Sequence, residues 1–303
     1  MEYAPIVLFV FNRPAHTQDL LETLEKCRLS DKSRLIIYAD GPKENALEDE
    51  KEKINEVRRI VKSRKWCGEV EIHESEKNRG LANSIIAGVG DILNKYGKAI
   101  ILEDDLHLSP GFLEFMNHAL TLYNDDEKVM HISGYMFPVK TKLPPTFFLM
   151  STTCWGWATW QRSWKYFNSS AAELQRQLIS SGRMDEFSFN NSTSFISQLE
   201  DNVSGKLKTW AIKWHASVVL QSGLCLHPFP SLVRNSGNDG SGTNGSIFEV
   251  QDQEITDHIE VKPIPIEENK SARKAFEILQ RTLNFKKSIP ERIFRKIIRI
   301  IRA

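Results

Sequence analysis

The sequence predicts an α/β protein built around a mostly parallel β-sheet with helices on both faces. In the first third of the chain, short apolar runs rich in β-branched residues alternate with longer segments whose apolar residues recur at helical spacing. The runs are continuously apolar, as expected of strands that are buried on both faces. Polar residues gather at the ends of these runs, which is where open α/β sheets bind ligands.

Four strands and three intervening helices are expected in this region. The strands are predicted at residues 5–11 (PIVLFVF), 34–40 (RLIIYAD), 69–73 (EVEIH) and in the run that begins at Lys98 (KAIIL). Each segment between them carries apolar residues on one side of a helix: Leu20, Leu21, Leu24 and Cys27; then Leu47, Ile54, Val57 and Val61; then Leu81, Ile85, Val89, Ile92 and Tyr96.

The fourth strand ends in three consecutive carboxylates, Glu103, Asp104 and Asp105. Such a triplet suits a hard divalent cation that bridges carboxylate and phosphate oxygens. The alternative is a solvated acidic turn before the helix predicted from Pro110, because carboxylates are favourable near a helix N-terminus. Polar residues after the other three strands favour the ligand site: Asn12 and Arg13, Asp40 and Gly41, and Asn78 and Arg79.

Two common nucleotide-binding motifs are missing from the sequence. Neither Gly-x-Gly-x-x-Gly after the first strand nor Gly-x-x-x-x-Gly-Lys-Ser/Thr occurs, which argues against dinucleotide and P-loop sites. A metal and either Arg13 or Arg79 are therefore expected to hold phosphate, because the planar guanidinium can make paired bonds to it. Either arginine could equally be an exposed loop cation.

An ordered set of motifs resembles the nucleotide-sugar glycosyltransferases of the GT-A fold, a Rossmann-like α/β fold. The similarity is to bacterial family 2-type enzymes and to the N-acetylglucosaminyltransferase I group, whose metal motif is also Glu-Asp-Asp. The motifs of the first half are Phe11–Pro14 (FNRP), Asp40–Gly41, Asn78–Ala82 (NRGLA) and Ile101–Phe112 (ILEDDLHLSPGF). In the second half, Cys154–Trp160 (CWGWATW) and Trp210–Trp214 (WAIKW) resemble the acceptor half, and Pro230–Gly237 with Gly240–Thr243 resembles a closing loop. The resemblance covers about residues 4–246.

The resemblance implies roles for individual residues. Asp40 would contact the nucleobase, Arg13 the nucleotide, and Asp105 would ligate Mn²⁺ or Mg²⁺ on the diphosphate. The remaining donor-binding residues expected from it are Asn12, Arg79, Glu103 and Asp104. A divalent cation would offset the negative charge that the diphosphate leaving group gains.

The catalytic base is the least defined part of this assignment. Lys208 and Thr209 stand where related sequences carry a carboxylate before the tryptophan, and Asn244 stands where they often carry histidine. An inverting transfer needs a base within hydrogen-bond reach of the acceptor hydroxyl. Glu200 and Asp201, the nearest acids upstream of Trp210, are nominated as catalytic residues. Their alternative role is that of charges on a helix surface.

Aromatic and imidazole side chains of the second half allow two interpretations. One or two tryptophans are expected to line an acceptor cleft, because sugar rings stack on flat apolar faces, and the rest to pack the core. The four that cluster in sequence are Trp155, Trp157, Trp160 and Trp164. His215 and His227 have no partner at metal-ligand spacing and are expected in core or surface positions.

Composition bounds the class of partner and the compartment. The 303 residues are 41% hydrophobic and 26% charged, and a net charge of +1 gives no attraction to nucleic acid. Four scattered cysteines fit a reducing interior. The sequence shows no signal peptide and no run of the ~20 apolar residues that a bilayer span needs, so we expect a cytoplasmic protein.

The last part of the chain differs in character. We expect a nucleotide-sugar-binding half at residues 1–125, an acceptor half at 126–247, a linker with a helical extension at 248–288, and a basic amphipathic tail at 289–303.

In the tail, isoleucines and Phe294 share one side of a helix, whereas Arg292, Arg295, Lys296, Arg299 and Arg302 share the other. The tail is expected to bind an anionic membrane surface. Its alternative is a helix docked on the body of the protein or on another subunit.

The resemblance and the basic tail together imply a bacterial, metal-dependent and inverting hexosyl- or N-acetylhexosaminyltransferase at the inner face of the cytoplasmic membrane. Its donor is expected to be UDP-linked, and its acceptor a surface polysaccharide or a lipid-linked glycan. A second reading is a sugar-1-phosphate nucleotidyltransferase, although Phe11–Pro14 does not match the Gly-rich loop of those enzymes. A third is a catalytically degenerate, membrane-associated binding protein. Lys208 and Asn244 favour this alternative, because they replace the carboxylate and the histidine of related sequences.

Overall fold

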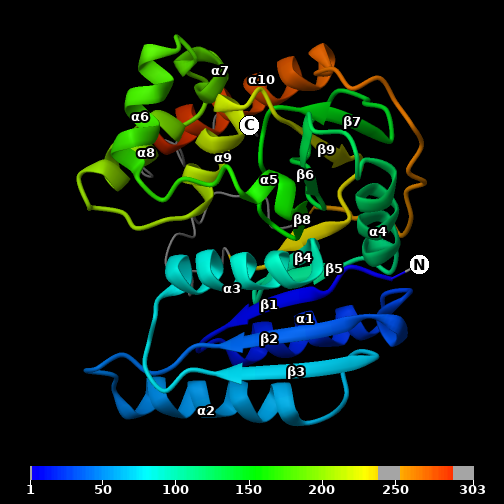
Figure 1. Ribbon diagram of the computed structural model, residues 1–303, viewed down its shortest axis with the longest axis vertical. Coiled ribbons are helices and arrows are strands. Elements are labelled where there is room, and N and C mark those ends of the chain that lie inside the picture. The colour runs from blue at the N-terminus through cyan, green and yellow to red at the C-terminus, as the bar shows by residue number, and fades with distance from the viewer. Residues whose placement is uncertain (1, 238–252, 289–303) are drawn as a thin grey trace, which may run out of the picture.

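The computed structural model describes residues 2–237 and 253–288 of the chain. In this described part, a central eight-stranded sheet runs through the molecule and is flanked by helices (Figure 1). Its strand order is β3-β2-β1-β4-β8-β6-β9-β7. The pairings are parallel in the first half and mixed in the second. This arrangement confirms the predicted α/β class with a mostly parallel sheet.

The first four strands lie close to their predicted positions. They are β1 (Ile6–Val10), β2 (Arg34–Ala39), β3 (Glu69–Glu74) and β4 (Lys98–Glu103). Strand β1 lies between β2 and β4 and is parallel to both, with Ile6 opposite Leu35 on one side and Ile100 on the other. The connecting helices are α1 (Pro14–Glu25), α2 (Glu48–Lys62) and α3 (Leu81–Tyr96), and the 3-10 turn η1 (Ser30–Lys32) precedes β2.

The side chains of β1 alternate between two cores, one on each face of the sheet. Ile6, Leu8 and Val10 pack into a core that includes side chains of α1, α2 and α4 (Phe112–Leu122). Val7 and Phe9 pack on the opposite face, with side chains of α3, α5 (Gln161–Trp164) and α9 (Ala211–Leu220). Because successive strand residues point to opposite faces, a sheet covered on both sides requires this continuous apolar run.

The second half of the chain extends the same sheet. Strand β8 (Trp157–Trp160) pairs antiparallel with β4, with Trp157 opposite Ile101. The sheet continues through β6 (Val129–Ser133), β9 (Leu224–Pro228) and β7 (Thr146–Leu149). The boundary expected at residue 125 falls between α4 and β6, and the sheet runs across it.

Helices form a separate layer beside α9. These are α6 (Ala171–Ser180), α7 (Met184–Ser188) and α8 (Phe195–Val203), which with α9 enclose a small core around Leu178, Phe187 and Leu199. Helix α10 (Lys270–Ser288) falls within the helical extension expected at 248–288, and it lies near β7 and this layer (Figure 1). The predicted tail at 289–303 lies outside the described residues. No helix in the described ranges is long and apolar enough to cross a membrane.

A two-stranded antiparallel sheet leads to the candidate site. Strand β5 (Leu106–Leu108) follows the acidic triplet and pairs with β10 (Val233–Asn235), so that Asn235 lies opposite Leu106. This pairing brings the chain after β10 next to Asp105.

Candidate active site

The acidic triplet lies at the point where the strand order reverses. From β1 the chain builds β2 and β3 on one side, and then crosses to β4 on the other. Arg13 follows β1, and Asp104 follows the adjacent and parallel strand β4. Ligands of open α/β sheets bind outside the carboxyl ends of strands at such a point.

Arg13 is bound to two of the three carboxylates. Its Nη2 donates to Asp104 Oδ1 and, at 2.9 Å, to Asp105 Oδ2. Its Nη1 is buried and has no hydrogen-bond partner in the described part of the chain. Burial by itself would lower the pKa of Arg13, but the two carboxylates outweigh it and raise that pKa, so the guanidinium stays charged.

The triplet is not a regular continuation of the strand. Strand β4 ends at Glu103, which lies opposite Phe9, and Asp104 and Asp105 form a turn before β5. The turn lets both aspartates reach Arg13, which alternating strand positions would not allow. The Glu103 side chain accepts no hydrogen bond from the described residues. Burial raises the pKa of the nearby Cys154 thiol, and Glu103 adds to that shift.

Three acidic side chains are crowded together in this cluster, and burial disfavours their charged forms. Burial raises the pKa of Glu103 to about 8, with further contributions from the charges of Asp105 and Asp104. Burial also raises the pKa of Asp104 to about 6, although Arg13 opposes this shift. One arginine therefore does not compensate three carboxylates, and the cluster is suited to a further cation.

Residues after β10 fix Asp105 from the other side. The backbone N–H and the hydroxyl of Ser236 both donate to the Asp105 carbonyl oxygen, at 2.8 and 3.0 Å. A Cβ on Gly237 would lie 2.3 Å from Asp105 Oδ2, so only glycine fits beside this carboxylate. The sequence placed Ser236 and Gly237 in a closing loop but did not predict this contact. The turn-forming composition of residues 235–237 was the available signal.

Asp40 organises the loop that begins α3. Its Oδ1 accepts from the backbone N–H of Gly41 and Arg79 at 2.8 and 2.9 Å. Its Oδ2 accepts from Asn78 Nδ2 and the N–H of Gly80 at 3.1 and 3.0 Å. Both oxygens are thus engaged within the chain. The Asp40 carboxylate thus orders the turn at residues 78–80 and Gly41, a local role beside the nucleobase contact that the resemblance implies.

Other predicted donor-binding residues line the same sheet edge. The side chain of Arg79 is exposed and that of Asn12 is half-buried, and neither makes a side-chain hydrogen bond or ion pair within the described residues. Because β2 and β4 flank β1, Asp40 and Asp104 stand roughly 10 Å apart, two strand spacings. The structure thus gathers the predicted set into two groups, one around Asp40 and one around Arg13.

The nominated bases are not part of either group. Glu200 is exposed on α8, and Asp201 pairs with Lys206 at 3.1 Å. In the described part of the chain, no hydrogen bond or ion pair links either acid to the triplet. The Asn202 side chain donates from Nδ2 to the Thr209 hydroxyl and accepts at Oδ1 from the Thr209 backbone N–H, both at 2.9 Å. The neighbouring Lys208 is exposed.

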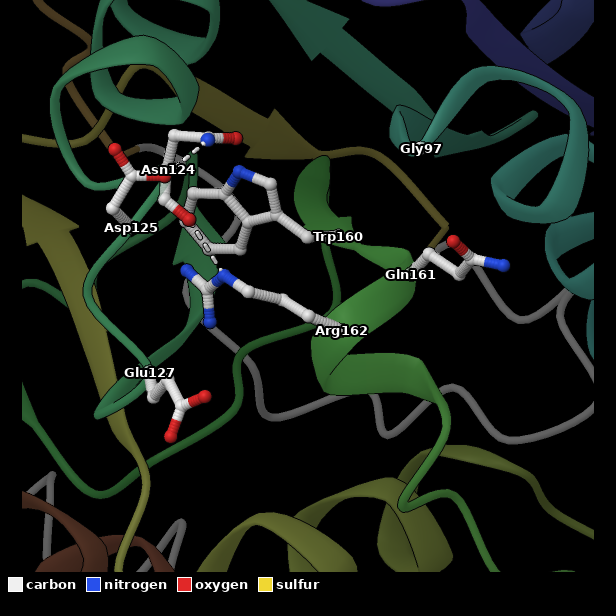
Figure 2. Close-up of a pocket in the computed structure, with 7 residues that line it drawn as sticks. All are labelled: Gly97, Asn124, Asp125, Glu127, Trp160, Gln161 and Arg162. Atoms are coloured by element: carbon white, nitrogen blue, oxygen red, sulfur yellow. Dashed lines mark hydrogen bonds between the residues drawn. The ribbon is translucent and has the colours of Figure 1, made fainter.

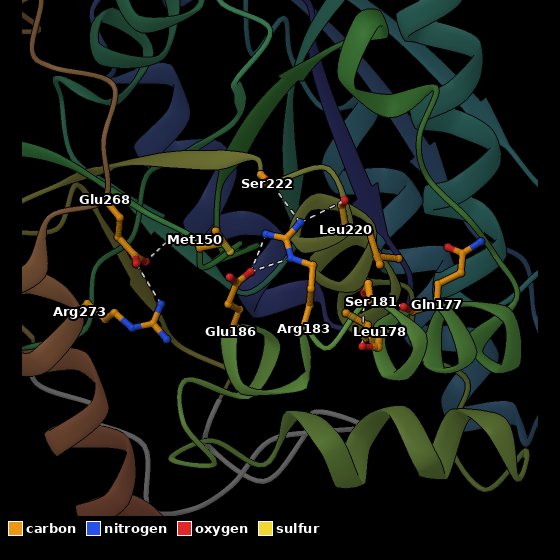
Figure 3. A network of polar contacts seen from close by, with 10 residues as sticks. All are labelled: Met150, Gln177, Leu178, Ser181, Arg183, Glu186, Leu220, Ser222, Glu268 and Arg273. Atoms are coloured by element: carbon orange, nitrogen blue, oxygen red, sulfur yellow. Dashed lines mark hydrogen bonds and ion pairs between the residues drawn. The ribbon is translucent and has the colours of Figure 1, made fainter.

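Charged residues elsewhere in the second half have structural partners. Arg183 donates to the Leu220 carbonyl and the Ser222 hydroxyl, and pairs with Glu186, which holds α7 against the end of α9 (Figure 3). Glu268 accepts from the Met150 backbone and pairs with Arg273, which holds α10 against β7 (Figure 3). These networks brace the fold and offer no unpaired acid to an acceptor.

Most of the clustered aromatic residues belong to the core. Trp157 and Trp160 are buried in the sheet. Trp164 packs against Trp157, with 5.8 Å between the ring centroids. Trp155 is only half-buried and meets Tyr135 edge-on at 4.6 Å, so it is the member of the cluster still available to an acceptor. His215 and His227 are buried, as expected, and burial lowers the pKa of each to about 4.

A pocket at the opposite edge of the sheet carries no candidate site. It is lined by residues near the start of β4 and the end of β8 (Figure 2). The Arg162 side chain lines this pocket and has structural partners. It donates to the carbonyls of Asn124 and Tyr123 at 2.7 and 2.8 Å, and its guanidinium carbon lies 4.3 Å from the centroid of the Trp160 ring. The pocket is thus at the amino end of β4, away from the triplet.

The carboxylates could bind a metal ion that is also bound by substrate phosphates and water, but they do not form a complete set of protein ligands. Within the described residues, no group of three or more His, Cys, Asp or Glu side chains is arranged to hold an ion. Mg²⁺ and similar cations are often held by one or two carboxylates together with substrate phosphates and water. Asp105, with Glu103 nearby in sequence, offers such a partial donor set.

Comparison with known proteins agrees with part of the sequence-based expectation. Residues 1–140 match the model of the GNT-I family. The match covers the parallel half of the sheet, Arg13, Asp40 and the triplet, and supports a glycosyltransferase enzyme. No curated protein matches the sequence.

Similarity to solved structures is weak. S. aureus TarS shares 11% identity over 48% of this chain and 23% of that chain, with a TM-score of 0.29, and a TarS fragment, 1–349, shares 12% over 48% and 38%, with a TM-score of 0.30. Mouse xyloside xylosyltransferase 1 in its apo form shares 8% over 71% of this chain and 81% of that chain, with a TM-score of 0.36. The matched region thus spans about a quarter of the TarS chain.

Proposed function

We propose that this protein is a metal-dependent glycosyltransferase that moves a sugar from a nucleoside diphosphate donor to a glycan acceptor. The observation that carries the proposal is the Glu103–Asp105 triplet at the strand switch point, bound to Arg13. The family match over the same residues supports it.

The donor would lie along the carboxyl edge of β2, β1 and β4. The nucleoside would bind near the loop that Asp40 organises, and the diphosphate near Arg13 and Arg79. Asp105, assisted by Glu103, would hold Mn²⁺ or Mg²⁺, which supplies charge compensation to the leaving diphosphate. Arg13 adds a permanent positive charge in a partly buried site, where electrostatic interactions are stronger than in water.

Acceptor activation would need a base within hydrogen-bond reach of the acceptor hydroxyl. Glu200 and Asp201 remain the proposed bases for an inverting transfer, and the acceptor would have to reach helix α8, which carries both. The pairing of Asp201 with Lys206 and the exposed Lys208 favour a second candidate function, a donor-binding protein that does not transfer sugar.

The wider context is also proposed from the sequence. A bacterial surface polysaccharide or lipid-linked glycan would be the acceptor, and a UDP-linked sugar the donor. The tail at 289–303 would hold the enzyme at the inner face of the membrane. These points rest on the resemblance and on the composition of the tail.

A donor screen tests the proposal. Thermal stability of the purified protein is measured with a panel of nucleotide sugars, each with Mn²⁺, with Mg²⁺ and with EDTA. We expect at least one nucleotide sugar to stabilise the protein only when a metal is present. The hit is then incubated with candidate glycan acceptors, and release of nucleoside diphosphate is measured.

The same assay separates the alternatives. Donor binding without hydrolysis or transfer would favour the binding protein. Formation of a nucleotide sugar and pyrophosphate from a nucleoside triphosphate and a sugar 1-phosphate would identify a nucleotidyltransferase. Absence of stabilisation by every nucleotide sugar would contradict all three readings.

A further inference from the structure

Arg13 forms an ion pair with Asp105, the carboxylate that is expected to bind the divalent cation. A single nitrogen, Nη2, serves both Asp104 and Asp105, and the second terminal nitrogen, Nη1, is buried without a partner in the described residues. A guanidinium makes its strongest contacts when two nitrogens bind one carboxylate or phosphate in parallel. In the observed arrangement, Nη2 therefore binds both aspartates, whereas Nη1 makes no hydrogen bond with the described residues.

The backbone around this contact is fixed on both sides. The Thr17 N–H and hydroxyl both donate to the Arg13 carbonyl, at 3.0 and 2.9 Å. The Asp105 carbonyl is held by Ser236, and Gly237 abuts its carboxylate. Any change in the contact must therefore come from side-chain rotation. Arg13, with its long and flexible side chain, is better able to rotate than the short Asp105 side chain beside Gly237.

On the basis of the function proposed above, we propose that Arg13 is a resident counter-ion that competes with the divalent cation for Asp105. In the ligand-free protein, Arg13 neutralises Asp105. When Asp105 binds a divalent cation, Arg13 is released and its free fork becomes available to the diphosphate of the donor.

This exchange couples metal and nucleotide. A cation binding alone has to displace Arg13 and therefore binds weakly. A diphosphate binding alone meets an arginine that is already paired. Each ligand favours the arrangement that the other needs, so each must raise the affinity of the other by the same factor.

Binding of Mn²⁺ alone tests the competition. Free Mn²⁺ is measured by electron paramagnetic resonance in titrations of wild type and Arg13→Gln, with no nucleotide present. We expect Arg13→Gln to bind Mn²⁺ about tenfold more tightly than wild type, because Asp105 no longer has an internal partner. Arg176→Gln is the matched control, since it removes a charge from an exposed ion pair with Glu173 on α6 and should leave Mn²⁺ affinity unchanged.

Repeating the titrations with saturating UDP tests the coupling. UDP should raise the Mn²⁺ affinity of wild type about tenfold more than that of Arg13→Gln, which keeps only the direct contact between the cation and the diphosphate. Arg13→Lys, which keeps a charge, provides a second variant if Arg13→Gln does not fold, and should bind Mn²⁺ alone as weakly as wild type. Weaker or unchanged Mn²⁺ binding by Arg13→Gln would overturn the competition.

Failure of the proposed function gives a different pattern. If no nucleotide sugar or UDP binds any form of the protein, the glycosyltransferase proposal fails. The comparison of Mn²⁺ affinity between wild type and Arg13→Gln still decides whether Arg13 competes for Asp105.

Discussion

The carboxylate of Asp40 accepts a hydrogen bond from the backbone N–H of Gly80 at 3.0 Å. This contact joins the end of β2 to the residue that precedes α3. It places a negatively charged group where the first N–H groups of a helix lack partners within the helix. Asp40 is thus a positioning residue for the loop that would receive the nucleoside.

Replacing Asp40 should affect stability and nucleotide binding together. Asp40→Ala removes a charged acceptor from three backbone N–H groups and from Asn78. We expect a loss of about 1–3 kcal/mol in the free energy of unfolding, measured by urea denaturation. On the proposal that this loop receives the nucleoside, affinity for UDP and for the UDP-sugar should fall by the same factor in calorimetry. A loss restricted to the sugar-bearing ligand would place Asp40 at the sugar instead.

The pKa of Glu103 gives a pH-dependent prediction. Its pKa is raised from 4.5 to about 8, so between these values the folded state binds more protons than the unfolded state. Stability contributed by the protonated form is therefore lost as the pH rises through about 8. Glu103→Gln removes this dependence and should stabilise the metal-free protein by roughly 1–3 kcal/mol at pH 8.5, with little change at pH 4.

Thermal melts of wild type and Glu103→Gln in EDTA, from pH 4 to 9, check this expectation. The difference between the two melting temperatures should grow with pH. A constant difference would show that the carboxyl group titrates as in solution.

Gly237 should be intolerant of a side chain. The Cβ of Gly237→Ala would lie 2.3 Å from Asp105 Oδ2 and has to displace that carboxylate. We expect metal-dependent stabilisation by the donor to be lost. Gly90→Ala is the matched control, because its Cβ meets nothing closer than Trp164 Nε1 at 3.9 Å and an added methyl group favours the helix. Normal donor binding by Gly237→Ala would show that the Asp105 carboxylate can move without consequence.

The C-terminal tail leads to a prediction about location. Truncation after Ser288 keeps α10 and removes the five basic residues, each worth about 1 kcal/mol near an anionic surface before screening. The full chain should sediment with anionic liposomes at low salt, and the truncated protein should remain in solution. Equal binding to neutral liposomes, or loss of a dimer on truncation, would favour a docked helix.

The first half of the fold was predictable because its signals are local. The strands and the helix Leu81–Tyr96 follow from apolar periodicity, and the meeting of Arg13 with the triplet follows from adjacent parallel strand ends. The sheet beyond β4 was not predictable in this way. Trp157–Trp160 looked like part of an aromatic acceptor motif, whereas it forms β8, whose place is set by pairing with distant strands.

Within the site, long-range contacts were the main omission. Ser236 reaches Asp105 across 131 positions through the pairing of β5 with β10, and no sequence period encodes that pairing. The four hydrogen bonds of Asp40 depend on the path of the Gly41 backbone, which passes so close to Ser75 and Lys77 that a Cβ would clash. Sequence reasoning identified Asp40 but not which groups it binds.

The central claim, metal-dependent donor binding at Asp105, is tested most directly by Asp105→Asn. The melting temperature is measured with the best nucleotide sugar, with and without Mn²⁺, for wild type, Asp105→Asn and the exposed control Asp125→Asn. The account predicts that the donor stabilises wild type and the control only with Mn²⁺, and that Asp105→Asn loses this stabilisation while remaining folded. Unchanged metal-dependent stabilisation of Asp105→Asn would contradict it.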